Sequence, residues 1–384
     1  MFEAHEFIGA ARAQAGLDDF GDDYFREGLD KLLHAAETEI RLNPRGRAAL
    51  RARTIGYLVN RLEVEHWYKL HPEIEDEEIV APLFGLGLPR TGSTVLQCLL
   101  AEDVSARSLR TWESEKPCPP PVAETQDTDP RIAMVEASQA GFNELARLAP
   151  EILTMLPLEG PRDPTECQDL LGLSVRNQAF VATALFGYID WLAGSDTEPA
   201  YRYHKRALKL LQWRCPPKKW RLKSPVHMLN LNALDKVYPD ARFVVTHRDV
   251  VDSIPSMAAL VAAIGGLFVD GLDVRAVGTG TARIWRIALD RMIDFRDRHP
   301  TERFRDIAFR AMQVDPIRGV RGLYDWLGES CTPEFEGRMQ AWREAHPKGK
   351  HGEHDVDPAA FGMSADGLRD QYARYLDRYS AFIA

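Results

Sequence analysis

The stretch GLPRTGST at residues 87–94 constrains the fold of this chain more than any other segment. The apolar run EEIVAPLFGLGLP leads into it and is of the kind that forms a buried parallel strand. GSTVLQCLLAED continues from it with helical periodicity. A strand, a glycine-containing turn and a helix in this order are the context of a phosphate-binding loop. The sequence therefore predicts an α/β fold of the P-loop type.

The loop departs from the pattern of nucleoside triphosphate sites at one position. Gly87 and Gly92 have the spacing of G-x-x-x-x-G-K-[ST], but Ser93 stands where that motif has the lysine that reaches the β- and γ-phosphates. Backbone N–H groups and a helix N-terminus still favour an anion there. The absence of the lysine favours a ligand with a single 5′-phosphate that bears a less charged group. The alternative is a plain strand–turn–helix with a capping Ser or Thr.

Two further segments that end in polar and basic residues, KKWRLKSP (218–225) and ARFVVTHRD (241–249), are predicted strands, and HMLNLNALDKVYP between them is a predicted crossover helix. The result is a parallel sheet flanked by helices. Ligands of such sheets bind beyond the carboxyl ends of the strands. We therefore expect the strand endings PRTGST, KSPVH and THRD to face one crevice.

Helical periodicity dominates the rest of the chain, so the fold is expected to have a large helical complement. Residues 1–75 are predicted to form a helical N-terminal extension that packs on the core. Residues 76–384 are predicted to form the P-loop-type domain, with one structural domain overall. The Pro-rich stretch 116–130 is expected to be an irregular surface excursion near the site.

Composition narrows the function classes. The net charge of −9 argues against a general nucleic-acid binder, which would show a basic footprint. The five cysteines include no C-x-x-C pair, which indicates reduced thiols and argues against a zinc site. Neither a secretory signal nor a segment long enough to span a bilayer is evident. We expect a cytoplasmic protein; its oligomeric state stays open, with a homo-oligomer as one option.

A second anion-binding element is predicted after the last of these strands. Arg248 closes the strand and Ser256 follows eight residues later, about two turns along the next helix. An arginine together with a hydroxyl can hold a phosphate group. The alternative is a surface arginine paired with Asp249 or Asp252, with Ser256 as a neutral helix residue.

Together, these motifs resemble the sulfotransferases that use 3′-phosphoadenosine 5′-phosphosulfate (PAPS). In that family a lysine-poor PR-[ST]-G-[ST]-[ST] loop binds the 5′-phosphosulfate, and an R-x7-S element binds the 3′-phosphate. The likeness is greatest to the bacterial-type branch, with W-E at 112–113, L-K-S-P-x-H at 222–227 and P-D-A-R-F-V-x-T-H-R-D at 239–249. It covers roughly residues 80–355 and also includes PTEC at 164–167. The resemblance implies that the donor is bound by Arg90, Thr91, Gly92, Ser93, Thr94, Arg248 and Ser256.

The resemblance implies an enzyme that transfers a sulfuryl group from PAPS to a hydroxyl or amine of a small-molecule acceptor and leaves 3′-phosphoadenosine 5′-phosphate (PAP). By analogy with phosphoryl transfer, catalysis of an in-line displacement rests on positioning and charge stabilisation, so no metal is required. Two alternatives stay open: a P-loop phosphotransferase or NTPase, and a non-catalytic nucleotide-binding protein. The acceptor pocket is expected in the variable helices, where Phe180 and Tyr188 would suit a hydrophobic acceptor or, equally, the core.

Three residues are candidates for the chemistry. Lys223, at a strand end, is expected to stabilise the leaving phosphate oxygen; the alternative is a surface lysine. Glu113 is one candidate base, because related sulfotransferases place a catalytic glutamate about twenty residues after the loop. His227 is the other, because histidine needs little tuning to act near neutral pH. The alternatives are an ordinary surface glutamate and a structural histidine.

A basic segment near the C-terminus, PKGKHG at 347–352, resembles the loop that closes over the 3′-phosphate in this family. The resemblance implies that Lys348 and Lys350 contact that phosphate. The alternative is a segment of basic residues without a role in the site.

Overall fold

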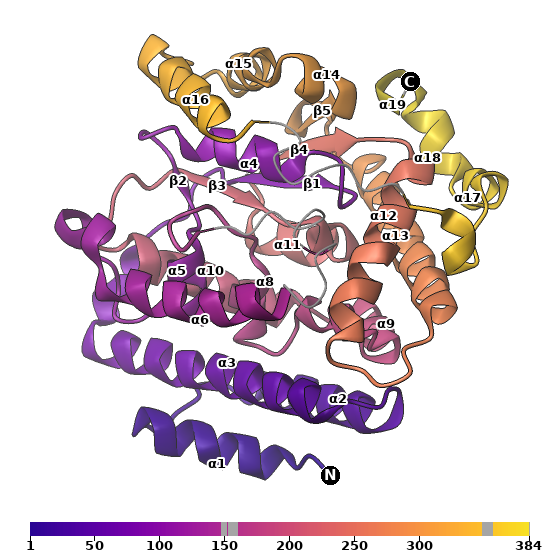
Figure 1. The fold of residues 1–384 in the computed structure, drawn as a ribbon. Coiled ribbons are helices and arrows are strands. Elements are labelled where there is room, and N and C mark those ends of the chain that lie inside the picture. Colours follow the sequence, from indigo (N-terminus) through magenta and orange to yellow (C-terminus); the bar gives the residue numbers. More distant parts are fainter. Residues whose placement is uncertain (147–151, 153–159, 348–355, 384) are drawn as a thin grey trace.

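The computed structural model describes residues 1–146, 152, 160–347 and 356–383. Its central feature is a parallel sheet in the order β2-β3-β1-β4-β5 (Figure 1). The strands are β1 (Leu83–Gly87), β2 (Arg107–Ser108), β3 (Trp220–Lys223), β4 (Arg242–His247) and β5 (Phe304–Ala308). The predicted α/β class with a parallel sheet and many helices is confirmed. The strands β2 and β5 were not among those predicted.

The strand β1 lies at the centre of the sheet and is buried along its whole length. It pairs on one side with β3, where Gly85 lies opposite Lys223, and on the other with β4, where Gly87 lies opposite Thr246. Because the three strands are parallel, their carboxyl ends meet at one edge of the sheet. The strand endings that precede PRTGST, KSPVH and THRD therefore lie along one edge as expected, with β1 between the other two strands.

Helices cover both faces of the sheet (Figure 1). Above it in this view lie α4 (Ser93–Ala101), α15 (Pro316–Leu327) and α16 (Pro333–Ala345). Leu96 and Leu99 of α4 pack there with Val244 of β4 in one buried cluster. Below it lie α10 (Glu198–Gln212) and α11 (Leu231–Val237), which share the main hydrophobic core with β1 and with α13 (Val274–Arg296). The predicted crossover segment thus contains α11, preceded by the 3-10 turn η4 (Pro225–Leu229).

The N-terminal segment forms three helices: α1 (Ala4–Ala15), α2 (Tyr24–Thr38) and the long α3 (Pro44–Leu70). The guanidinium of Arg61 in α3 is buried and donates to the Phe20 carbonyl and to Asp22. Apolar side chains of all three helices belong to the same hydrophobic core as β1. The division into an extension and a core domain at residue 75 stays a prediction.

The remaining elements connect or flank these layers. The other α-helices are α5 (Thr111–Glu115), α6 (Pro130–Ala146), α8 (Gln168–Gly172), α9 (Phe186–Gly194), α12 (Val250–Gly266), α14 (Phe309–Val314), α17 (Ala365–Gln371), α18 (Ala373–Arg378) and α19 (Ser380–Ile383). The other 3-10 turns are η1 (Pro72–Asp76), η2 (Ala123–Thr128), η3 (Ala179–Thr183), η5 (Thr301–Arg303) and η6 (Pro358–Phe361). Over the ranges given above, no helix is both long and apolar enough to cross a bilayer.

The contact between β1 and β4 requires a glycine at the end of β1, and this predicts a stability effect. Gly87 has φ of 122°, and a Cβ atom there would lie 2.4 Å from the Thr246 carbonyl oxygen. We expect Gly87→Ala to lower the free energy of unfolding by at least about 2 kcal/mol, through backbone strain and the clash with β4. Urea unfolding measures the change.

The matched control is Gly337→Ala in α16, where nothing lies within 4 Å of an added Cβ. Alanine at such a helical position is expected to raise the free energy of unfolding by up to about 1 kcal/mol. Equal stability of the two variants would contradict the structural role assigned to Gly87.

Candidate active site

The loop that follows β1 is held in a specific backbone conformation. Arg90 has φ of 70° and Gly92 has φ of 82°, both in the left-handed region. For a non-glycine residue such as Arg90 this conformation is strained, and such strain clusters at ligand-binding turns. The Thr91 hydroxyl donates to the Leu88 carbonyl (2.6 Å) and shares a hydrogen bond with the Thr246 hydroxyl (2.6 Å). The loop is thus tied to β4 and leads into the N-terminus of α4, which begins at Ser93.

Two arginines and a serine meet beside this loop. Arg90 Nε donates to Ser256 Oγ (3.3 Å), and Arg248 Nη1 donates to the Arg90 carbonyl (3.0 Å). Burial, and then the nearby charge of Arg248, lower the pKa of Arg90 below its ordinary value. The predicted pair of Arg248 and Ser256 therefore lies next to the phosphate-type loop. The result is a concentration of positive charge on a chain whose net charge is −9.

The alternative interpretation of Arg248, as a surface ion pair, accounts for only part of its contacts. Its Nε lies 3.4 Å from Asp252, a largely exposed side chain. Asp249 instead caps α12, where its side chain accepts a hydrogen bond from the Val251 N–H (2.9 Å). The guanidinium also lies over the Phe309 ring, 4.3 Å from its centroid. Arg248 thus points towards the glycine turn rather than away from it.

Lys223 lies at the end of β3 and packs against β1. A Cβ atom on Gly85 would lie 2.9 Å from Lys223 Cγ, so the glycine makes room for the lysine side chain. Its Nζ donates to Glu166 Oε1 (2.7 Å), and the hydroxyl of the next residue, Ser224, donates to Glu166 Oε2 (2.7 Å). Glu166 is a residue of this region that was not among the predicted site residues. The only signal for it was its place in the PTEC segment.

Glu113 is completely buried, with 0% of its side chain exposed. Its carboxylate accepts hydrogen bonds from Arg107 Nη2 (2.5 Å), from the Arg110 N–H (3.2 Å) and from Gln126 Nε2 (3.0 Å). Arg107 belongs to β2 and its guanidinium also lies over the Trp220 ring, 5.0 Å from its centroid. Glu113 therefore joins α5 to β2 through a buried ion pair, not the ordinary surface position considered above. Its role as a base stays a prediction.

His227 is also completely buried, among aromatic side chains on one face of the sheet. Its Nδ1 shares a hydrogen bond with the Tyr201 hydroxyl (2.8 Å), and its ring meets the edge of Phe84 at a centroid distance of 5.1 Å. Burial, and then the nearby His204, hold the pKa of His227 well below its ordinary value of 6.5. The imidazole is therefore neutral at neutral pH. Whether it also acts in catalysis stays a prediction.

The two buried histidines of this cluster predict that stability falls in mild acid. Burial lowers the pKa of His204 to about 3 and also lowers that of His227, so both stay neutral in the folded protein. Below about pH 6.5 the unfolded chain binds protons that the folded chain does not. The free energy of unfolding should then fall by about 1.4 kcal/mol per pH unit for each histidine. Urea unfolding between pH 7 and pH 5, at about half-unit steps, measures the slope.

The variant His204→Gln isolates one of these contributions, because glutamine keeps a partner for the Tyr238 hydroxyl that His204 contacts at 2.8 Å. The variant should reduce the slope of the free energy of unfolding against pH by about 1.4 kcal/mol per pH unit below pH 6.5. A slope identical to that of the wild type would show that His204 is protonated in the folded state.

The other predicted cofactor contacts, Lys348 and Lys350, lie outside the residues that the structure describes. Their assignment to the 3′-phosphate stays a prediction.

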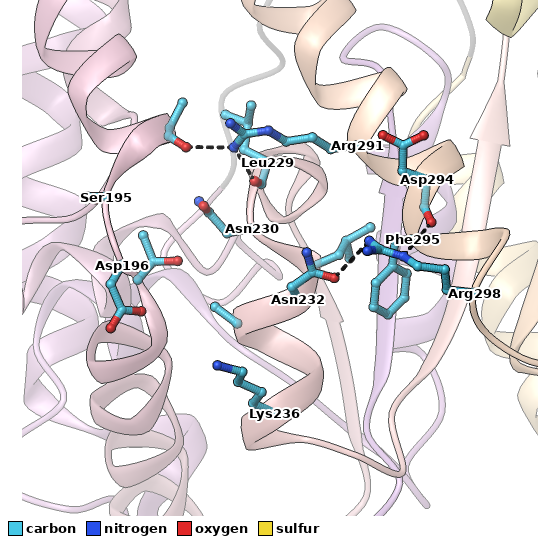
Figure 2. Close-up of a pocket in the computed structure, with 14 residues that line it drawn as sticks. Ser195, Asp196, Leu229, Asn230, Asn232, Lys236, Arg291, Asp294, Phe295 and Arg298 are labelled. Carbon is cyan, nitrogen blue, oxygen red and sulfur yellow. Dashed lines mark hydrogen bonds between the residues drawn. The ribbon is translucent and has the colours of Figure 1, made fainter.

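Figure 2 shows a separate pocket of about 310 Å³ between the end of α9, the η4–α11 segment and α13. Arg291 of α13 lines it and donates to the carbonyls of Ala193 (2.7 Å) and Leu229 (2.8 Å), so it links α9 to η4. Arg298 donates to the Asp294 carbonyl. The lining contains none of the loop, strand-end or base candidates. This pocket is therefore distinct from the residues that meet at the carboxyl edge of the sheet.

Comparisons with known proteins agree with this geometry. The model of the sulfotransferase family matches residues 82–333, a span that contains the loop, Lys223 and Arg248. The crystal structure of sulfotransferase STF9 from Mycobacterium avium superposes with a TM-score of 0.89 at 30% identity, over 100% of this chain and 98% of that one. Sulfotransferase STF1 from Mycobacterium tuberculosis H37Rv superposes with a TM-score of 0.85 at 28% identity, over 97% of this chain and 99% of that one. No curated protein matches the chain. Since the family model spans more than half of the chain, the chain belongs to the sulfotransferase family.

Proposed function

We propose that the protein transfers a sulfuryl group from PAPS to a hydroxyl or amine of a small-molecule acceptor and releases PAP. The observation that carries the proposal is the meeting of Arg90, Arg248 and Ser256 beside a phosphate-type loop that lacks the triphosphate lysine. A ligand with separate phosphates on its 5′ and 3′ positions matches two adjacent anion-binding elements, the loop and the pair of Arg248 and Ser256.

The residues present fit such a donor on electrostatic grounds. The N-terminus of α4 and the N–H groups of the loop favour a 5′-phosphosulfate, with the hydroxyls of Thr91, Ser93 and Thr94 nearby in the sequence. Arg248 and Ser256 would hold the 3′-phosphate. Burial, and then the charge of Arg248, lower the pKa of Arg90, and an anion bound between the two guanidinium groups would relieve their repulsion.

Lys223 is the proposed electrophilic group. Lys223 is the last residue of β3, and its Cα atom pairs with that of Gly85 in β1, two residues before the loop begins at Gly87. A cation at this position would stabilise negative charge on the phosphate oxygen that leaves sulfur. Because the side chain is largely buried, its charge acts in a medium less screened than water.

The finer features of the function rest on the family resemblance. We propose a bacterial-type, cytoplasmic enzyme. The acceptor is expected to be a small and hydrophobic molecule. Phe180 and Tyr188, which would suit such a pocket, pack edge to face in the core with ring centroids 6.4 Å apart. They therefore add no support for a particular acceptor.

Transfer of labelled sulfur from PAPS tests the proposal. The purified protein is incubated with ³⁵S-labelled PAPS and a panel of phenols, aliphatic alcohols and amines, and sulfated products and PAP are separated by chromatography. The proposal expects PAP formation that depends on the acceptor, with one labelled product for each PAP. Release of free sulfate at the same rate with and without acceptors would contradict it.

A further inference from the structure

One carboxylate contacts two consecutive residues at the end of β3. Glu166 accepts from Lys223 Nζ through Oε1 and from Ser224 Oγ through Oε2, each at 2.7 Å. We assign to Lys223 the role of stabilising the leaving phosphate oxygen. Glu166 therefore lies within one hydrogen bond of the cation around which the reaction is expected to occur.

The backbone around Glu166 is anchored on three sides. The Thr165 N–H donates to the Leu109 carbonyl (2.8 Å), and the Cys167 N–H donates to the Lys223 carbonyl (3.2 Å). Gln97 of α4 donates through Nε2 to the Thr165 carbonyl (2.6 Å). Glu166 is thus held between the end of β3 and the helix that follows the phosphate-type loop.

Accessibility separates Glu166 from the two bases predicted from the sequence. Its side chain is 30% exposed, whereas those of Glu113 and His227 are fully buried. The Glu113 carboxylate is already enclosed by three donors, and one of them is a buried arginine. Of these three candidates, Glu166 alone combines contact with Lys223 and access from solvent, which an acceptor hydroxyl requires.

We propose that Glu166 is the general base of the reaction and that its ion pair with Lys223 holds both side chains in place before the donor binds. This inference rests on the proposed sulfotransferase function. As the acceptor oxygen bonds to sulfur, its proton passes to a carboxylate oxygen of Glu166. The bond from sulfur to the phosphate oxygen breaks, and its electron pair remains on that oxygen beside Lys223.

The ion pair gives Glu166 a second effect, on donor binding. In the structure its negative charge neutralises Lys223, and this opposes the binding of an anionic donor at the same place. When a phosphate oxygen takes over the contact with Lys223, the carboxylate loses that partner and is left to accept a hydrogen bond from the acceptor hydroxyl. Removal of the charge at residue 166 should therefore affect donor affinity and proton transfer in opposite directions.

The variant Glu166→Gln tests both effects, with PAP affinity from isothermal titration and kcat from PAPS turnover. We expect kcat with phenol to fall at least about 100-fold, while PAP binds as tightly as to the wild type or up to about tenfold more tightly. With 4-nitrophenol, which is largely ionised at about pH 8 and carries little proton to remove, kcat should fall less than about fivefold. A merely structural role would lower both rates alike.

The matched control is Glu329→Gln. Glu329 contacts Arg221 (2.5 Å) and Lys219 (3.1 Å) near the start of β3, so it is another partly exposed carboxylate paired with cations of the same strand region. We expect its kcat and PAP affinity to stay within about twofold of the wild type.

Three results would overturn the proposal: a Glu166→Gln enzyme with wild-type kcat on phenol, equal losses with both phenols, or a loss of PAP affinity that matches the loss of rate. If Glu113→Gln instead lowered kcat far more with phenol than with 4-nitrophenol, the base would be Glu113. If the proposed sulfotransferase function itself were wrong, the result would differ, because the wild-type protein would then fail to bind PAP.

Discussion

The variant Lys223→Ala is expected to lower kcat for sulfuryl transfer by about 10²- to 10³-fold, the usual cost of removing one group that stabilises developing negative charge. The largest effect is expected here because Lys223 is largely buried and contacts the proposed base. PAP, which has no sulfonate to lose, should bind with an affinity within about tenfold of the wild type. Stopped-time assays with labelled PAPS give kcat, and isothermal titration gives the PAP affinity.

The matched control is Lys219→Ala, four residues earlier on the same segment. Lys219 pairs at the surface with Glu329 (3.1 Å), and 44% of its side chain is exposed. Its loss should leave kcat within about twofold of the wild type. Wild-type kcat in the Lys223→Ala variant would remove Lys223 from the mechanism, and comparable losses in both variants would point to a general effect on the strand.

The second large effect is expected from Arg248→Ala, on binding rather than on rate. Loss of one partner of a partly buried charge pair costs about 2–4 kcal/mol, so PAP affinity should fall by about 30- to 1,000-fold. AMP, which lacks the 3′-phosphate, should bind the wild type and the variant within about threefold of each other. The difference between the two ligands isolates the contact of residue 248 with the 3′-phosphate.

An exposed arginine on a helix serves as the control for this experiment. Arg318 of α15 is exposed, and its substitution by alanine removes the same charge from the protein. PAP affinity should change by less than about twofold, because the charge of an exposed side chain is screened by salt. If Arg248→Ala weakened AMP as much as PAP, Arg248 would act on the loop as a whole through its bond to the Arg90 carbonyl.

The fold class could be predicted because its strongest signals are local. The apolar run before Gly87 and the apolar centre of 241–249 are buried central strands, which typically read as near-continuous apolar runs. Trp220–Lys223 is buried as well, although apolar and basic residues alternate in it. The strand β2 has only two residues, Arg107 and Ser108, which is too short for any periodicity. The edge strand β5 is buried only at Phe304 and Ile307 and reads FRDIA, a polar sequence for a parallel sheet.

The site residues at strand ends could be predicted from the sequence. The residues that reach the site only through tertiary contacts could not. Arg248 and Lys223 were found because parallel strands bring their carboxyl ends together. The ion pair of Glu113 with Arg107 depends on how the short helix α5 packs against β2, which no periodicity encodes. Glu166 comes to Lys223 from a segment 57 residues earlier, so only the folded chain shows their contact.

Direct titration of the wild-type protein with PAP, and separately with ATP and magnesium, tests the central claim most directly. That claim is that the lysine-free loop, together with Arg248 and Ser256, selects a nucleotide with separate 3′- and 5′-phosphates. The account predicts that PAP binds at least about 100-fold more tightly than ATP with magnesium, as one well-placed additional phosphate contact would provide. Equal or tighter binding of ATP with magnesium would contradict it and would favour a P-loop phosphotransferase or NTPase.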